Sequence, residues 1–236
     1  MSDTPKPATL ISGFATSVPL ILGYFPIAFS FGVAATRSGL TPVETFSLSL
    51  FIYAGAAQFL AIALIATGAP VLISVLTLVA MNLRHVLYGP TLMRKAGPGA
   101  LRKWSWAWAF GLTDEVFGAA LAALAGGKRF SEPFMFGLAI GAYGAWLSGT
   151  ALGAYAGGGA LERWPAVSAG LGFMLPALFL SLLLSIVTRA QLGVIAIAMA
   201  ATVGVSLVYG GTAGLLSGMV AGAVAGVLGV GARDAG

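Results

Sequence analysis

Long stretches without a charged side chain are the main pattern along this chain. No charged residue occurs in residues 7–36, 45–83 or 190–232. A helix needs about 20 predominantly apolar residues to cross the roughly 30 Å hydrocarbon layer of a bilayer. The first stretch therefore predicts one membrane-spanning helix, and each of the other two is long enough for a pair.

Turn-forming residues divide the two longer stretches, at 67–70 in one and at 209–212 in the other. Three further apolar stretches predict spans at 104–127, 133–160 and 164–188. The pattern predicts an all-α fold, a polytopic transmembrane helix bundle of about eight spans, with seven as the alternative count. We expect a single membrane domain over residues 1–236, with a short N-terminal tail at 1–9.

Composition narrows the class of protein. Only 8% of the 236 residues are charged and 58% are hydrophobic, whereas soluble domains carry about 25% charged residues. The chain has no cysteine, which excludes a disulfide framework and metal sites built on thiolates. The net charge of +5 comes from basic residues scattered between apolar stretches, which is typical of membrane loops. We therefore expect no nucleic-acid partner, no cofactor and no metal.

The membrane orientation stays open from the sequence. With eight spans, five basic residues fall on the side of the termini and six on the opposite side. The positive-inside rule then favours neither side by count, although the densest basic segment, 94–103, favours its own side as cytoplasmic. A single re-entrant segment would reverse the side of everything that follows it.

Glycines recur at four-residue spacing along two predicted helices. They are Gly137, Gly141, Gly149, Gly153 and Gly157 in the fifth span, and Gly214, Gly218, Gly222 and Gly226 in the last. Residues four apart stay near one helical face, and faces without side chains allow close helix contacts in lipid. These faces pack within the chain or against another subunit of a homo-oligomer, and the last helix is the better candidate for a subunit interface.

Asp114 and Glu115 lie about eleven residues into a predicted span, close to the bilayer midplane. A charged side chain there costs about 2.5 to 3.5 kcal/mol on insertion, so it usually faces the bundle interior or an aqueous path. Neighbouring helical residues point about 100° apart, so we expect one carboxylate on the path and the other beside a structural partner. The alternative is a purely structural pair neutralised by an internal basic residue.

Asn82, Arg84 and His85 form a second polar group within an apolar stretch. If the helix continues through Tyr88, Arg84 lies in the membrane and pairs with a carboxylate or receives a substrate carboxylate. If the helix ends near His85, both basic residues are interfacial anchors. His85 is the only histidine, and it is either structural or a proton relay.

Proline and glycine are expected to interrupt two helices. The residues concerned are Pro19, Gly23 and Pro26 in the first span, and Gly172 and Pro176 in the sixth. Proline removes a backbone donor, and broken helices in corresponding halves of a transporter indicate a binding site. Simple kinking is the alternative. Gln58 is the only amide in its predicted span, and it either lines a site or bonds to a neighbouring helix.

Several ordered motifs stand out along the chain. They are Gly23, Pro26, Phe31, Gly32 and Ala35 with Gly39 and Leu40; YAGAAQF at 53–59; NLRH at 82–85; TDE at 113–115 with Phe117; and Gly172, Pro176 and Phe179. Together they resemble the AzlC-type branched-chain amino-acid exporters. The resemblance is strong over residues 11–118 and weaker towards the C-terminus.

The resemblance implies a permease of the bacterial inner membrane that exports leucine, isoleucine, valine and similar neutral amino acids. It also implies a second component, a small membrane subunit of the AzlD type. Methionine or another small solute is the alternative substrate, and a non-transporting scaffold or a channel is the alternative function. An enzyme is not expected, because one histidine and no cysteine leave little for a catalytic site.

The residues expected along the substrate and proton path are Tyr24, Pro26, Gln58, Asn82, Arg84, His85, Thr113, Asp114, Glu115 and Pro176. We expect Arg84 to bind the substrate carboxylate or to neutralise Asp114. One of the two carboxylates would hold the proton or the substrate ammonium. Gln58, Asn82 and the interrupted backbone near Pro26 and Pro176 would orient the substrate.

Overall fold

The computed structural model describes residues 8–97, 99–100, 103–157, 159, 163–167, 169–171, 173, 177, 180, 184, 187 and 189–230. Every regular element among them is helical, which confirms the predicted all-α membrane bundle. Contacts divide the chain into two compact units, residues 1–175 and 176–236, and each is described by itself. Within the described part, four helical stretches are long and apolar enough to cross a membrane: Leu10–Arg37, Val71–Ala96, Glu132–Ala156 and Leu192–Tyr209.

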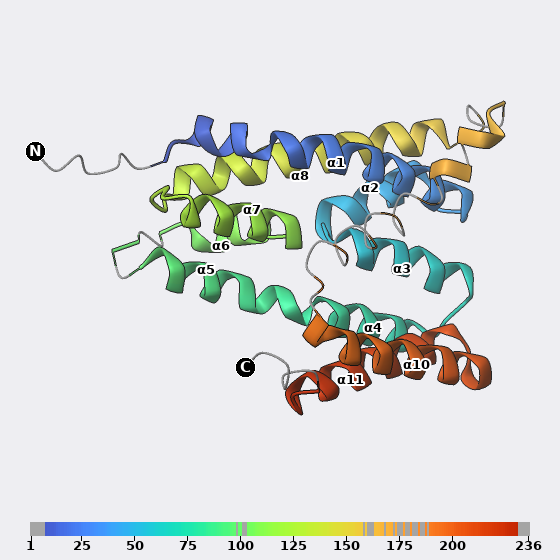
Figure 1. Cartoon of the computed structure of the whole chain (residues 1–236). Helices are drawn as coiled ribbons and strands as arrows, with labels where there is room; N and C mark the ends of the chain where they lie inside the picture. The colour runs from blue at the N-terminus through green and yellow to red at the C-terminus, as the bar shows by residue number, and fades with distance from the viewer. Residues whose placement is uncertain are drawn as a thin grey trace, which may run out of the picture. The chain divides into compact units, whose positions relative to one another are not determined.

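Two long helices, α1 (Leu10–Arg37) and α8 (Glu132–Ala156), lie side by side in the first unit (Figure 1). A Cβ atom added to Gly137, near the start of α8, would lie 2.0 Å from the carbonyl oxygen of the first residue of α1. One added to Gly153, near the end of α8, would lie 2.0 Å from the carbonyl oxygen of Phe29. The two helices are therefore parallel, and they are so close that only glycine fits at these contacts.

The other glycines of this stripe also face α1. A Cβ atom at Gly141, Gly149 or Gly157 would come within 2.5 Å of an atom of α1. The stripe therefore packs within the chain, as the first of the two alternatives expected. Because α1 occupies this face, it is not a subunit interface.

A short helical hairpin enters the unit from the end where α1 finishes. Its arms are α2 (Pro42–Phe51), which follows α1 after a four-residue turn, and α3 (Gly55–Ala66). On the returning arm, Ile62 packs against Phe31 and Ala35 in the last turns of α1. The arms of 10 and 12 residues are about 15 and 18 Å long, so each reaches about half-way through a bilayer roughly 30 Å thick.

A second hairpin, α6 (Ser105–Phe110) and α7 (Asp114–Ala125), enters from the opposite end. Before α6, the backbone N–H of Trp104 donates to the carboxylate of the first residue of α8 at 2.7 Å. After α7, the Nζ of Lys128 donates to the hydroxyl of Thr16 near the start of α1 at 3.1 Å. Both ends of this hairpin therefore lie beside the starts of α1 and α8.

These two hairpins replace two of the expected spans. The prediction of single crossings at 45–66 and 104–127 is wrong, because the chain turns back near the middle of each stretch. Apolar length alone could not reveal this, since two half-length helices contain as many apolar residues as one crossing. Irregular backbone at membrane depth is tolerated where protein or a water-filled cavity surrounds it.

The helix interruptions expected at proline do not occur in the first span. Pro19 and Pro26 both lie inside α1, which continues through them over 28 residues. Neighbouring helices can satisfy the carbonyl groups that proline leaves free, so a proline need not end a membrane helix. The second expected interruption, at Gly172 and Pro176, lies outside the described residues.

One crossing connects the two hairpins. It consists of α4 (Val71–Asn82), a 3-10 turn η1 (Leu83–Leu87) and α5 (Tyr88–Ala96). These segments form a continuous apolar stretch of 26 residues. Arg84 lies near its middle, so the alternative in which the helix ends near His85 is wrong.

The second unit contains a helical hairpin of its own. After a short 3-10 turn, η2 (Arg189–Gln191), α10 (Leu192–Tyr209) and α11 (Gly211–Val227) meet at Gly210, as the turn predicted at 209–212 required. Added Cβ atoms at three glycines of α11 would meet α10 within 3.1 Å: Gly214, Gly218 and Gly222. For these three, the expectation of a subunit interface on the last helix is wrong, because α10 occupies the face. An added Cβ at Gly226 meets nothing within 4 Å.

Candidate functional site

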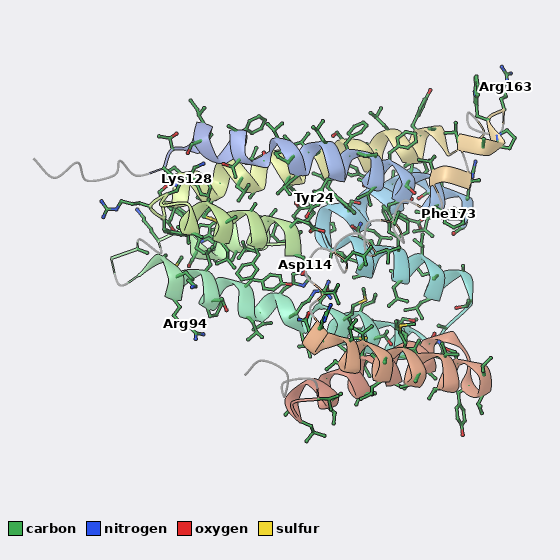
Figure 2. All side chains as sticks on the ribbon, in the orientation of Figure 1. Tyr24, Arg94, Asp114, Lys128, Arg163 and Phe173 are labelled. Carbon is green, nitrogen blue, oxygen red and sulfur yellow. The ribbon has the colours of Figure 1, made fainter. Side chains whose placement is uncertain are left out.

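The tips of the two re-entrant hairpins meet in the middle of the first unit. Tyr53, at the tip between α2 and α3, has its ring centroid 6.2 Å from that of Phe110 at the tip between α6 and α7. Tyr143 of α8 lies between them, with its ring centroid 4.7 Å from Tyr53 and 5.7 Å from Phe110. An aromatic cluster therefore joins the tips at mid-membrane depth. Figure 2 shows the nearby Tyr24 and Asp114 in this central region, far from Arg163.

The sequence Thr113-Asp114-Glu115 starts the outgoing arm of the second hairpin. The hydroxyl of Thr113 accepts a hydrogen bond from the backbone N–H of Val116 and caps α7. The two carboxylates occupy the first helical turn, where the partial positive charge of the helix N-terminus favours negative side chains. This local chemistry therefore starts a helix in the middle of the apolar stretch 104–127 and places two acids in its first turn.

Asp114 forms an ion pair with Arg84 of the 3-10 turn η1. The Arg84 Nε and Nη2 atoms donate to the two carboxylate oxygens at 3.0 and 2.8 Å. Tyr88 donates a further hydrogen bond to Asp114, and its ring stacks on Phe117 with centroids 4.5 Å apart. The Arg84 and Asp114 side chains are 43% and 36% exposed. The bidentate pair uses two of the five guanidinium N–H donors, and through it Arg84 neutralises Asp114.

Glu115 lies in a different environment from Asp114, as expected for adjacent helical residues whose side chains point about 100° apart. The Tyr24 hydroxyl of α1 donates to its Oε2 at 2.6 Å, and the Thr113 hydroxyl lies 2.5 Å from the same tyrosine oxygen. With Glu115 ionised, the single Tyr24 proton points to the carboxylate, and Thr113 donates to Tyr24. No cationic side chain in the described part of the chain forms an ion pair with Glu115. It is thus a half-buried carboxylate bonded to one neutral donor, the Tyr24 hydroxyl.

Gln58 belongs to a chain of hydrogen-bonded polar side chains. Its Nε2 donates to Ser49 at 2.8 Å, and its Oε1 accepts from the indole N–H of Trp146 at 2.9 Å. Ser49 in turn bonds to Thr150 at 2.7 Å. The amide therefore ties both arms of the first hairpin to α8, in agreement with the structural alternative.

The remaining expected site residues are arranged around these groups. Asn82 donates to the carbonyl of Leu78 within its own helix at 2.9 Å. His85 lies 3.1 Å from the carbonyl of Asn82 and packs edge-on against Tyr88. Pro26 lies half-buried in α1, and Pro176 lies outside the described residues. No group of three or more histidine or acidic side chains suited to a metal is found among the described residues.

Tyr53 is a residue of the site that the sequence did not single out. Its φ angle is +39°, the one positive value for a residue other than glycine in the described chain. It is 4% exposed, and its hydroxyl has no hydrogen-bond partner among the described residues. Strained backbone and unsatisfied buried polar groups concentrate at functional sites. Its position in the YAGAAQF motif is the one feature of the sequence that points to it.

The first hairpin also presents an uncapped helix start at this tip. Ala54 precedes α3 and provides no side-chain hydrogen bond to its first turn. The backbone N–H groups at a helix start have no partner within the helix and attract anions. The two tips are therefore complementary. One presents backbone donors with a tyrosine hydroxyl, and the other presents Glu115, a carboxylate without an ion-pair partner in the described part of the chain.

Residues 19–159, which include both hairpins and the crossing between them, match the family model described as AzlC protein. The chain belongs to the AzlC family. Among its AzlC relatives is the inner membrane protein YgaZ of Escherichia coli (strain K12), which is 46% identical over 212 residues, covering 87% of this chain and 86% of that protein. An uncharacterized membrane protein of Archaeoglobus fulgidus is 38% identical over 184 residues, 78% of either chain. No solved structure matches this AzlC chain.

Proposed function

We propose that this AzlC protein is a secondary transporter that exports branched-chain or similar neutral aliphatic amino acids across the bacterial inner membrane in exchange for protons. The observation that carries the proposal is the meeting of two re-entrant helix tips beside an unpaired carboxylate at mid-membrane depth. Discontinuous helices that end near the bilayer midplane are the usual sites for substrates and coupling ions in transporters. The inner-membrane location is proposed from the Escherichia coli relative, which is named as an inner membrane protein.

Glu115 is the group that we assign to the proton and to the substrate ammonium. Its hydrogen-bond donor is the neutral Tyr24 hydroxyl, which bonds to Oε2, and no cation pairs with it among the described residues. An ionised carboxylate inside a membrane protein is costly unless a positive partner neutralises it. A proton or an ammonium group can each supply that neutralisation, and only one of them can occupy the carboxylate at a time.

The start of α3 is the group that we assign to the substrate carboxylate. Its first backbone N–H groups lack a side-chain cap, and the adjacent Tyr53 hydroxyl lacks a partner. Half-helix N-termini bind anionic substrate groups in transporters with broken helices. This assignment replaces the expectation for Arg84, whose guanidinium is bound in bidentate fashion to Asp114.

Competition at Glu115 accounts for exchange. On the cytoplasmic side, the ammonium group of an amino acid displaces the proton, and the loaded carrier releases the amino acid outside, where a proton returns to the carboxylate. A zwitterion then leaves the cell for each proton that enters. The inward proton gradient thereby drives export.

The second component, a small AzlD-type membrane subunit, rests on the family resemblance. Many apolar side chains of α4 are exposed in the isolated chain, among them Val71, Leu72, Val75, Leu76 and Val79. Such a surface needs lipid or another membrane protein around it. We propose that transport reaches its full rate only when this subunit is present.

Counterflow in proteoliposomes tests the proposed function. Vesicles preloaded with leucine should accumulate labelled leucine in a saturable manner, and faster when the small subunit is reconstituted with the chain. No accumulation with either preparation would contradict the transporter and favour a scaffold. Linear, non-saturable entry would instead indicate a channel.

Binding of leucine analogues tests the two assigned groups separately. Leucine should bind. Leucine methyl ester, which lacks the carboxylate, and 4-methylpentanoate, which lacks the ammonium group, should each bind more weakly than leucine. Tyr53→Phe should weaken leucine binding about tenfold, since a hydrogen bond to a charged group contributes about 1.5 kcal/mol or more. Unchanged leucine affinity in Tyr53→Phe would remove that residue from the site.

A further inference from the structure

A basic pocket lies at the end of the first unit where α1 and α8 begin. It has a volume of about 310 Å³ and is formed by the C-terminal ends of α5 and α7 with the loops that follow them. Among the described residues, three cationic side chains line it: Lys95, Lys128 and Arg129. Gly97, Leu124 and Phe130 complete much of the remaining wall. None of the described residues that line this pocket is acidic.

No acidic side chain in the described part of the chain forms an ion pair with the three cations of the pocket. Lys128 donates to the neutral hydroxyl of Thr16. The acid nearest in the chain, Glu132, is 7% exposed and accepts hydrogen bonds from Trp104 and from the indole of Trp108. The two helix C-termini supply about half a negative charge each, which leaves roughly two of the three positive charges uncompensated.

The depth of the pocket corresponds to the polar layer of a membrane. Trp104 and Trp106, at the entrance of the second hairpin, are 46% and 72% exposed. Exposed tryptophans mark the level of the lipid headgroups, and Lys103 lies over the Trp104 ring at 5.5 Å. Lys128 and Arg94 are at this same end of the unit (Figure 2). A ligand of this pocket is therefore expected to be negatively charged and located in the headgroup layer.

The distribution of basic residues between the two ends of the first unit indicates which end faces the cytoplasm. Five described basic residues lie at this end, namely Arg94, Lys95, Lys103, Lys128 and Arg129, whereas Arg37 and Arg163 lie at the opposite end of the unit. The second hairpin brings together two basic loops that a single crossing would separate. By the positive-inside rule, this end faces the cytoplasm.

We propose that the pocket binds the phosphate group of an anionic phospholipid from the cytoplasmic leaflet. Basic pockets between membrane helices on this side bind such headgroups, and each nearby lysine or arginine strengthens the attraction. The bound lipid bridges the ends of α5 and α7. Helix α7 begins with Asp114 and Glu115, and α5 begins with Tyr88, which donates to Asp114. The lipid therefore stabilises the two helices that hold the carboxylates of the proposed transport site. The lipid site itself does not depend on the transport proposal.

Phosphatidylglycerol binding to the purified protein in detergent tests the proposal. Wild type should bind it saturably and at least tenfold more tightly than phosphatidylcholine with the same acyl chains. Raising the ionic strength should weaken the binding, because salt screens exposed charges. Equal binding of the two lipids would overturn the proposal without any substitution.

A pair of double variants separates the pocket from general surface charge. Lys95→Gln with Arg129→Gln should lower the affinity for phosphatidylglycerol about 30-fold. Arg94→Gln with Lys103→Gln removes the same charge from the same end, outside the pocket, and should change the affinity less than threefold. Equal losses in both double variants would contradict a specific site. If the first double variant fails to fold, Arg129→Gln alone should still lower the affinity about fivefold, and an unchanged affinity would contradict the site.

A competition experiment identifies the source of the phosphate. Inorganic phosphate and glycerol phosphate should compete with phosphatidylglycerol only at concentrations at least a hundredfold higher than the lipid. Competition at equal concentration would show that the site takes a soluble phosphate, which would overturn the assignment to a lipid.

Discussion

Replacing Gly153 with alanine should separate the two central helices. The new Cβ atom would lie 2.0 Å from the Phe29 carbonyl oxygen and 2.8 Å from its carbon, whereas ordinary contact begins at 3.4 Å. These are backbone atoms, so no side-chain rotation relieves the clash, and the helices must move apart by about 1.4 Å at this point.

The size of the effect follows from two opposing terms. Overpacking costs about 1 to 3 kcal/mol, and here the upper end applies because backbone has to move. Alanine regains about 0.8 to 1 kcal/mol over glycine in a helix, which leaves a net loss of about 2 kcal/mol. For a chain of this size, that corresponds to a decrease in Tm of roughly 4 to 8 °C.

Thermal unfolding in mild detergent measures this loss against a matched control in the same helix. Gly144 is exposed, and a Cβ there would meet nothing within 4 Å. Gly144→Ala should therefore leave Tm unchanged or raise it slightly. A Gly153→Ala protein as stable as the Gly144→Ala protein would refute the close packing of α1 on α8.

Two further predictions concern the second hairpin and its ion pair. Because the chain has no cysteine, Lys103→Cys and Gly126→Cys can be labelled separately with a membrane-impermeant maleimide. Both should react from the cytoplasmic side. Labelling from opposite sides would show that the chain crosses the membrane between them. Arg84→Ala should lower stability by about 1 to 2 kcal/mol, since it leaves the half-exposed Asp114 without its partner. The double variant Arg84→Ala with Asp114→Ala should recover part of that loss in the same unfolding assay, and an equal or greater loss would show that the pair is not coupled.

The apolar pattern predicted the helical class and some of the site. It correctly predicted α1, α8 and the turn at 209–212, because each involves a full-length apolar helix or a glycine turn. It also placed Arg84 and the two carboxylates in the same region, since a lone charge in an apolar stretch requires a partner. The ion pair of Arg84 with Asp114 is the contact that this argument anticipated.

The re-entrant hairpins could not be predicted from apolar length, but one local signal for them was present. Thr113 followed by two acids has the chemistry of a helix N-terminus, although it lies in the middle of an apparent span. Reading it as a cap would have placed a helix start at mid-membrane. The break at Tyr53 has no such signal, because its positive φ depends on the tertiary packing of Phe110, Tyr143 and Trp146 around the ring.

Leucine counterflow by a Glu115→Gln protein tests the central claim most directly. Glutamine keeps the size of the side chain and removes its charge, so neither a proton nor an ammonium group is bound there. Glu44→Gln is the matched control, because Glu44 is exposed, bonds to the Thr41 backbone N–H at 2.8 Å, and glutamine also serves in this helix cap. We predict that Glu115→Gln abolishes saturable counterflow while Glu44→Gln retains it. Counterflow at the wild-type rate in Glu115→Gln would contradict a transport site at the hairpin tips.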